Sequence, residues 1–249
     1  MPLLGHILLA KIARDAGFDI PAVADSPWLA FDTAGSALRL WLRDDASGPV
    51  AALSSRAVLS ELDVPVLDVA VLPPAAAGAF QFPTADAMLT ALARAQALNQ
   101  SLPDRPYREF VEQLSELGAT ERDAIVRQRV GQDRFRDALM QYWGGRCAVT
   151  GLAVPELLRA SHAKPWKVAN DRERLDVHNG LLLAVQLDAL FDRGFLWFDS
   201  CGDGALSPAL GAKDRRMLGL GGFPLRLSRL SPAHEPFLAY HRDHVAIRA

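Results

Sequence analysis

The chain has 249 residues, half of them apolar, and carries a net charge of −2. A chain of this length and composition can bury one large hydrophobic core or two modest ones, so we expect it to fold without a partner. Its weak acidity excludes a simple non-specific coat for DNA, which would be far more basic.

The two cysteines, Cys147 and Cys201, lie far apart and form no Cys-x-x-Cys pair. This excludes a disulfide framework and a four-ligand zinc site, so we expect no structural zinc and predict that both cysteines are packed as small apolar residues. No apolar run reaches about 18 residues, and the start of the chain holds neither a basic leader nor a cleavage site. We therefore expect a cytoplasmic protein with no membrane partner.

The first part of the chain mixes helical and strand-like hydrophobic patterns. It predicts a helix from Leu3 to Ala16 and another from Asp86 to Leu98. It also predicts strands at residues 28–31, 38–42 and 50–53, a hairpin turn at 44–48 and a loop at 73–78. We therefore expect residues 1–100 to form a small α+β domain.

Pro103 and Pro106 predict that no helix passes through residues 101–106. We place the domain boundary in this segment, so that a second domain covers residues 107–249. It is predicted to begin with a charged helix over residues 107–118 and a second helix capped by Thr120. Four arginines on the second helix form either a solvated face or a phosphate contact: Arg127, Arg129, Arg134 and Arg136.

The two parts differ in charge. Residues 1–100 hold 6 Lys and Arg against 10 Asp and Glu, whereas residues 101–249 hold 21 against 19. The excess of positive charge in the second part is small, but it makes that part the better candidate for contact with a phosphate backbone.

Two short strands are predicted in the second domain, at residues 146–149 and 157–162, and the later strand ends on His162. Asn179 follows 17 residues after this histidine, and Asp188 lies a further nine residues on. A strand-end histidine alone is most often a satisfied or solvent-facing residue. The spacing to the amide and the carboxylate is what makes it a candidate for chemistry.

Asp188 lies near the start of a predicted short helix that ends at Asp192, and Gly194 suits the turn after a helix C-terminus. The apolar residues of this helix form a stripe, so its two carboxylates, four residues apart, share the other face. Phosphodiester hydrolysis needs a base that activates water, a cation that neutralises charge, and a group that fixes the base's tautomer. His162, Asp188 and Asn179 could supply these in that order.

Four fragments in this order resemble the HNH endonuclease family, whose fold is the ββα-metal fold. The fragments are Arg146–Gly151, Ala160–Trp166, Asp176–Leu183 and Leu187–Gly194. The resemblance covers roughly residues 120–200. It implies that His162 is the general base, that the side-chain oxygen of Asn179 orients the imidazole, and that Asp188 binds a divalent cation.

The sequence departs from the family pattern at the expected metal ligands. Ser161 stands where many members have an aspartate, and Asp188 stands where the wider family usually has histidine or asparagine. With Asp192 as a helper, these oxygen donors favour one Mg²⁺ or Mn²⁺ ion over zinc or nickel. The cysteine knuckles of many members are missing, so we expect an apolar core: Cys147, Leu182, Leu183, Phe191, Phe195, Trp197 and Phe198.

Basic residues beside His162 are candidates for DNA contact. Lys164 and Lys167 flank a Pro-Trp pair just beyond the base, and Arg159 precedes it; each lysine either contacts phosphate or solubilises a loop. His178 lacks the strand-end context and is not expected to be the base. The remaining segment is predicted to form a hairpin and then a helix over residues 236–246.

We therefore expect an α+β protein with a C-terminal HNH domain that hydrolyses DNA, leaving 5′-phosphate and 3′-hydroxyl ends by analogy with the family. The expected setting is restriction or defence, with residues 1–100 choosing the target. Double-strand cleavage would need a homodimer or two successive nicks. The alternatives are a DNA-binding or regulatory protein that retains the HNH fold with weak or no cleavage, and a nuclease that acts on RNA.

Overall fold

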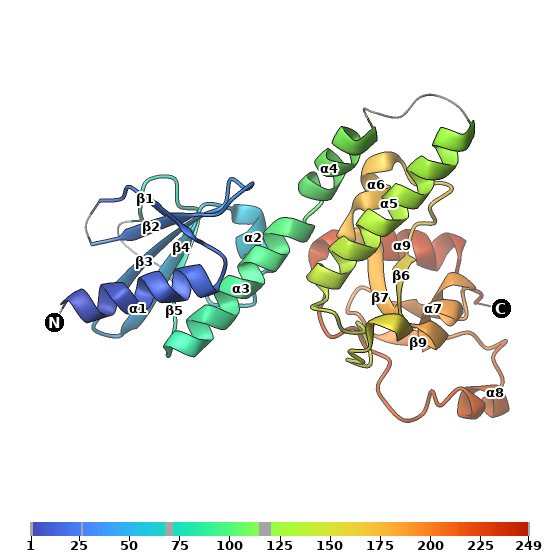
Figure 1. Ribbon diagram of the computed structural model, residues 1–249. Helices are drawn as coiled ribbons and strands as arrows, with labels where there is room; N and C mark the ends of the chain where they lie inside the picture. The colour runs from blue at the N-terminus through green and yellow to red at the C-terminus, as the bar shows by residue number, and fades with distance from the viewer. Residues whose placement is uncertain (1, 26, 68–71, 115–120, 249) are drawn as a thin grey trace. The chain divides into compact units, whose positions relative to one another are not determined.

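The structure is a computed structural model, which describes the whole chain except residues 1, 26, 68–71, 115–120 and 249 (Figure 1). Helices and antiparallel sheets occur together, which confirms the α+β class. The chain divides into two compact units, residues 1–99 and 100–249. In the part of the chain that the structure describes, no helix has the length and apolar character to cross a membrane.

The first unit is built on a five-stranded antiparallel sheet with the strands in chain order. Its strands are β1 (Ile20–Ala22), β2 (Leu29–Asp32), β3 (Arg39–Asp45), β4 (Gly48–Leu53) and β5 (Gly78–Gln81), and its helices are α1 (Pro2–Asp15), α2 (Arg56–Glu61) and most of α3 (Ala85–Ser101). Leu40, Trp41 and Leu42 are all buried, so both faces of the central strand β3 are covered. Strands β1 and β5 were not expected, because each is too short to show a clear alternating pattern.

The predicted break at residues 101–106 is only partly correct. Helix α3 ends at Ser101, and α4 (Asp104–Leu114) begins three residues later, with Pro106 inside it. Proline is tolerated in the first turn of a helix, because the N–H that it lacks would have no partner within the helix. The expected cap Thr120 lies outside the described residues, and α5 (Glu121–Tyr142) follows it.

The second unit contains a hairpin followed directly by a helix. Strand β6 (Leu158–His162) pairs antiparallel with β7 (Gly180–Ala184), and His162 lies opposite Gly180. Helix α7 (Val185–Asp192) begins at the next residue. This is a ββα arrangement, as the family resemblance implied, but its second strand, β7, was not predicted. The short helix α6 (Asp171–Leu175) lies in the connection between the strands.

The predicted strand at residues 146–149 is wrong. The chain turns tightly here: Cys147 N–H donates to the Leu152 carbonyl, and Gly151 N–H donates back to the Cys147 carbonyl. Gly151 has a φ of 72°, a backbone conformation that glycine adopts without strain. The segment still contacts the hairpin, because Ala148 N–H donates to the Leu182 carbonyl.

The hairpin lies between two helices, with α5 on one face and α7 on the other. Phe135 and Leu139 of α5 pack so close to β7 that a Cβ atom on Gly180 would overlap the Phe135 ring and lie 2.9 Å from Leu139 Cδ1. On the other face, Leu187 and Phe191 of α7 are fully buried. Gly180 therefore allows the close contact between α5 and the hairpin.

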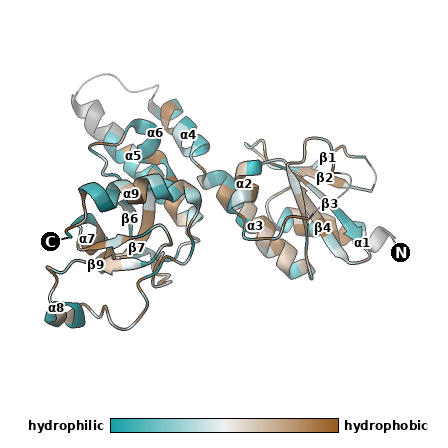
Figure 2. Ribbon diagram, turned by 180° about the vertical axis from the view of Figure 1, so that it is seen from behind, coloured by the Kyte–Doolittle hydropathy of each residue, from teal (hydrophilic) through white to brown (hydrophobic). Residues whose placement is uncertain are grey.

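The C-terminal segment packs against the end of α7. Its elements are β8 (Leu196–Phe198), β9 (Gly204–Leu206), α8 (Ala212–Met217) and α9 (Glu235–His244). Strands β8 and β9 and helix α9 agree with the predicted hairpin and helix, whereas α8 was not predicted. Gly194 ends α7 with a φ of 74°, and the Ile247 N–H donates to its carbonyl. A Cβ atom here would overlap the Val245 carbonyl, so only glycine lets the tail close over the helix end. In Figure 2 helix α8 is largely hydrophilic, coloured teal.

The expected core is mostly correct. Cys147, Leu182, Leu183, Phe191 and Phe198 are buried, whereas Phe195 and Trp197 are only partly covered. The Cys147 sulfur accepts hydrogen bonds from the backbone N–H groups of Thr150 and Ala184, so it has a structural place. Cys201 is exposed, which contradicts its predicted packing, because it lies in the turn between β8 and β9.

Candidate active site

Two oxygen-bearing side chains meet where β6 contacts α7, and a third lies nearby on the same helix. Ser161 is 2% exposed, and its hydroxyl donates a hydrogen bond to Oδ1 of Asp188. Asp192 lies one helical turn further along α7. Partial burial of its carboxyl, and then the nearby charge of Asp188, raise the pKa of Asp192. The helix therefore holds two carboxylates that repel each other beside a buried hydroxyl.

This donor set fits a hard divalent cation. A cation between two carboxylates would relieve their repulsion, and Ser, Asp and water oxygens are the ligands that Mg²⁺ and Mn²⁺ accept. Within the described residues, no three His, Cys, Asp or Glu side chains gather in a way that could hold a metal. A cation here would therefore depend on two carboxylates, one hydroxyl and additional oxygens from water or substrate.

His162 ends β6 and faces the other helix, α5. Its ring stacks on Phe135 with centroids 3.7 Å apart, and the Trp166 ring lies nearly perpendicular to it with centroids 5.5 Å apart. Nε2 lies 2.9 Å from the carbonyl oxygen of Arg174. A carbonyl can only accept a hydrogen bond, so Nε2 carries the proton and Nδ1 keeps the lone pair.

Burial determines the charge of this imidazole. Desolvation outweighs the hydrogen bond to the Arg174 carbonyl and lowers the pKa of His162 to about 4. The ring is therefore neutral at pH 7, and the residue remains partly exposed at the strand end. A neutral ring with a free lone pair has the protonation state that a general base needs.

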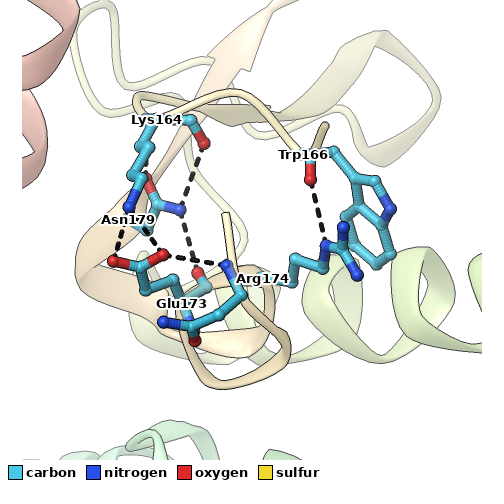
Figure 3. Close-up of polar contacts among 6 residues, drawn as sticks. Lys164, Trp166, Glu173, Arg174 and Asn179 are labelled. Atoms are coloured by element: carbon cyan, nitrogen blue, oxygen red, sulfur yellow. Dashed lines mark hydrogen bonds and ion pairs between the residues drawn. The ribbon is translucent and has the colours of Figure 1, made fainter. Parts of the chain in front are cut away.

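Asn179 does not play the role that the sequence suggested. Its Oδ1 accepts from the Lys164 N–H at 2.7 Å, and its Nδ2 donates to the carbonyls of Glu173 at 2.9 Å and Lys164 at 3.2 Å (Figure 3). The side chain is fully buried and holds both ends of the loop that follows His162. The expected hydrogen bond from Asn179 to the ring is replaced by the one to the Arg174 carbonyl.

The structure brings together only part of the predicted site. Ser161 and His162 are consecutive in a strand, so their side chains point to opposite faces of the hairpin, toward α7 and α5 respectively. In the contacts of the described residues, none joins the His162 ring to Asp188 or Asp192. The oxygen cluster, formed by Ser161, Asp188 and Asp192, therefore lies on one side of the end of β6, and the imidazole lies on the other.

The predicted DNA contacts have different surroundings. Lys164 Nζ lies 2.7 Å from both carboxylate oxygens of Glu173, so it already has a partner within the chain. Arg159 is exposed and donates to the carbonyls of Glu156 and Leu158. Lys167 is exposed, and no hydrogen bond or ion pair of its side chain is found among the described residues.

Three of the other candidates, His178, Arg134 and Arg136, have partners within the chain. His178 is buried and hydrogen-bonds Asp176 through Nδ1, as expected of a residue that is not the base. Arg136 donates to the carbonyls of Pro155 and Leu158 and so anchors the entry to β6. Arg134 pairs with Glu109, Arg129 is exposed, and the side chain of Arg127 lies outside the described residues.

Sequence reasoning missed Glu173, Arg174 and Phe135. A signal existed for Glu173, because Asn170 and Glu173 have the spacing of a capping box, and the structure contains both of its hydrogen bonds. Arg174 acts through its backbone carbonyl, which no side-chain pattern reveals. Phe135 lies on a distant helix, and only the packing of α5 on the hairpin brings it to His162.

The first strand of the hairpin ends on a neutral histidine, and its second strand leads into the helix that carries Asp188 and Asp192. Residues 147–199 match the family model of the HNH endonucleases, which confirms the resemblance for this segment. No curated protein compared with the chain gives a match. The match indicates an endonuclease that acts on DNA, and HNH nucleases generally use a divalent metal.

Proposed function

We propose that the chain is an endonuclease that hydrolyses DNA phosphodiester bonds with one Mg²⁺ or Mn²⁺ ion and with His162 as the general base. The observation that carries the proposal is the contact of Ser161 with Asp188, one residue away from a neutral, oriented imidazole. A phosphate at the end of β6 would have the oxygen cluster on one side and this ring on the other.

Ser161, Asp188 and Asp192 are the residues that would hold the cation. When bound, the ion would neutralise negative charge on the phosphate and on the departing oxygen. The three protein oxygens leave coordination positions for water and for a phosphate oxygen, which suits an ion that keeps part of its hydration shell.

His162 would take the proton of the attacking water at Nδ1, because Nε2 is engaged with Arg174. The oxygen of this water forms a bond to phosphorus while the bond to the 3′ oxygen breaks, and the 3′ oxygen then takes a proton from solvent. By analogy with the family, the products are 5′-phosphate and 3′-hydroxyl ends. A phosphate anion beside the ring also favours its protonated form and so strengthens the base.

We further propose that residues 1–100 select the target of a restriction or defence nuclease. This part folds as a compact unit with its own buried cluster, which contains Trp28, Trp41 and Val50. It contains none of the residues of the candidate active site. Its contribution can be tested by comparing cleavage of unmodified, methylated and phosphorothioated DNA by the full chain.

Nicking of a supercoiled plasmid with Mg²⁺ or Mn²⁺ tests the nuclease. We expect cleavage by the wild type, loss of activity with EDTA, and a fall of at least about 100-fold in His162→Ala and in Asp188→Asn. His6→Ala, which changes an exposed histidine of the first unit, is the matched control. DNA binding without cleavage in either metal would instead favour the alternative, a DNA-binding protein that has lost the reaction. Preferential cleavage of RNA in a competition assay would contradict the proposed substrate.

A further inference from the structure

An ion pair bridges the loop between β6 and β7. Lys164 follows β6 by two residues, and Glu173 lies in α6, on the return path to β7 (Figure 3). The ammonium lies 2.7 Å from each carboxylate oxygen, and the two side chains are only 21% and 25% exposed. The hydrogen bond from Lys164 is the largest of the effects that lower the pKa of Glu173. The pair is therefore a charged, two-point contact that is partly shielded from solvent.

Glu173 is held by more than the lysine. Its carboxylate accepts from the Asn170 N–H at 2.9 Å, its own N–H donates to the Asn170 side chain at 3.0 Å, and its carbonyl accepts from Asn179. Both the side chain and the main chain of Glu173 are therefore hydrogen-bonded, which fixes its backbone. The next peptide carbonyl along the chain is that of Arg174.

The Arg174 carbonyl is the group that contacts His162. The guanidinium of Arg174 donates to the Trp166 carbonyl at 3.0 Å, lies 5.1 Å from the centroid of the Trp166 ring, and pairs with Asp171 at 2.8 Å. The side chain therefore supports the same turn whose backbone oxygen meets Nε2. Figure 3 shows the contact of the Arg174 guanidinium with the Trp166 carbonyl.

We propose that Lys164 and Glu173 are positioning residues for the general base. By fixing the Glu173–Arg174 backbone, the ion pair sets the Arg174 carbonyl against Nε2 of His162 and selects the imidazole tautomer with the proton on Nε2. This inference rests on the proposed function for its catalytic consequence, whereas the tautomer itself does not depend on it. Lys164 is then a structural cation and not a phosphate contact.

The physical reason is the limited choice of partners at Nε2. In the opposite tautomer, the Nε2 lone pair would face the carbonyl lone pairs at the same short distance, which is repulsive. That tautomer would also place the proton on Nδ1, the nitrogen that must accept a proton from water. A carbonyl that moves away removes this preference, so part of the population becomes unable to act as a base.

The test measures tautomer and activity in the same full-length variants. Nitrogen-15 labelling of the histidines allows NMR to distinguish Nε2–H from Nδ1–H in His162, with His162→Ala used to assign the signal. The variants are Glu173→Gln, which keeps the shape but not the charge, Lys164→Met, and the exchanged pair Lys164→Glu with Glu173→Lys. Arg172→Ala, an exposed cation of the same helix, is the control.

We expect the wild type and Arg172→Ala to show Nε2–H. We expect Glu173→Gln and Lys164→Met to show a mixture of tautomers and a kcat lower by about 10- to 100-fold, with KM changed less than about threefold, because the base and not substrate binding is affected. The exchanged pair should recover part of both readouts.

An unchanged tautomer and kcat in Glu173→Gln would overturn the inference. So would a rise in KM alone in Lys164→Met, which would identify this lysine as a phosphate contact. A shift of tautomer in a chain whose wild type cleaves no DNA would support the positioning role and contradict the proposed nuclease, so the two failures are distinguishable. If one of these variants does not fold, the tautomer and kcat of the other variants still test the inference, because each variant alters the Lys164–Glu173 pair in a different way.

Discussion

The ring of His241 lies flat on the ring of Phe191, with centroids 3.8 Å apart and planes 1° from parallel. Nε2 of His241 also hydrogen-bonds the Phe191 carbonyl at 2.9 Å. Helix α9 is thereby fixed to the last turn of α7, one residue before Asp192. His241 is 1% exposed, and among the described residues its Nδ1 has no hydrogen-bond partner, so protonation would bury a charge without an acceptor.

This environment makes stability depend on pH. Burial lowers the pKa of His241 to about 4 from an ordinary value near 6.5, so between these values the unfolded chain binds more protons than the folded one. The free energy of unfolding is therefore highest above about pH 6.5, and it decreases by roughly 2 to 3 kcal/mol as the pH falls toward 4. Urea unfolding at pH 7.5 and pH 5 measures the difference. His241→Gln should show a smaller difference than the wild type, with the remainder assigned to His162; an equal difference would contradict the prediction.

Replacing Gly180 by alanine should destabilise the second unit. The new methyl group would overlap Phe135 and contact Leu139, so α5 or β7 must move, at a cost of about 1 to 3 kcal/mol. Chemical denaturation gives this value directly. In the double variant with Phe135→Leu, part of the loss should be recovered, because the smaller side chain leaves room. If the effects of the two substitutions on stability were strictly additive, the methyl group introduced at position 180 and the Phe135 ring would not clash.

The carboxylates of α7 should control cation affinity. We expect Asp188→Asn to weaken Mn²⁺ binding by at least about tenfold, Asp192→Asn by a similar factor, and Ser161→Ala by less, because a hydroxyl is a weaker ligand than a carboxylate. Electron paramagnetic resonance of free Mn²⁺ measures the affinity without any cleavage assay. Asp214→Asn on α8 is the control. An unchanged affinity in Asp188→Asn would mean that the cation does not bind at these carboxylates.

Lys167 should contribute to DNA binding through charge alone. Its exposed side chain has no ion pair among those of the described residues, so Lys167→Ala should weaken binding equally for different sequences. The slope of log affinity against log salt should fall by about one, as expected for the loss of one phosphate contact. Fluorescence anisotropy between about 50 and 200 mM salt measures the slope. A change that depends on the base sequence would instead indicate base contact.

Spacing and hydrophobic pattern predicted the strand that ends on His162 and the helix that carries Asp188 and Asp192, but no strand at residues 180–184; the ββα fold itself was implied by the family resemblance. His162 ends its strand, Asp188 and Asp192 share the outer face of α7, and Gly194 ends the helix, because each follows from local geometry. The strand expected at residues 146–149 failed for a local reason as well. Gly151 adopts a left-handed backbone conformation and so favours a turn, whereas the four residues before it, of mixed polarity, give only a weak strand pattern.

The orientation of the base could not be predicted in the same way. Asn179 and His162 lie 17 residues apart, and the partners of the amide depend on how the intervening loop closes. That closure is set by the Lys164–Glu173 pair and by the backbone oxygen of Arg174. The oxygen that contacts the imidazole belongs to the main chain of Arg174, and a pattern of side chains does not predict which main-chain carbonyl will lie there.

The closure at Gly194 has a practical consequence for handling the protein. The Ile247 N–H donates to the Gly194 carbonyl, so the segment after α9 completes the hydrogen bonding at the end of α7. Truncated versions of the second unit should therefore retain residues through Ile247.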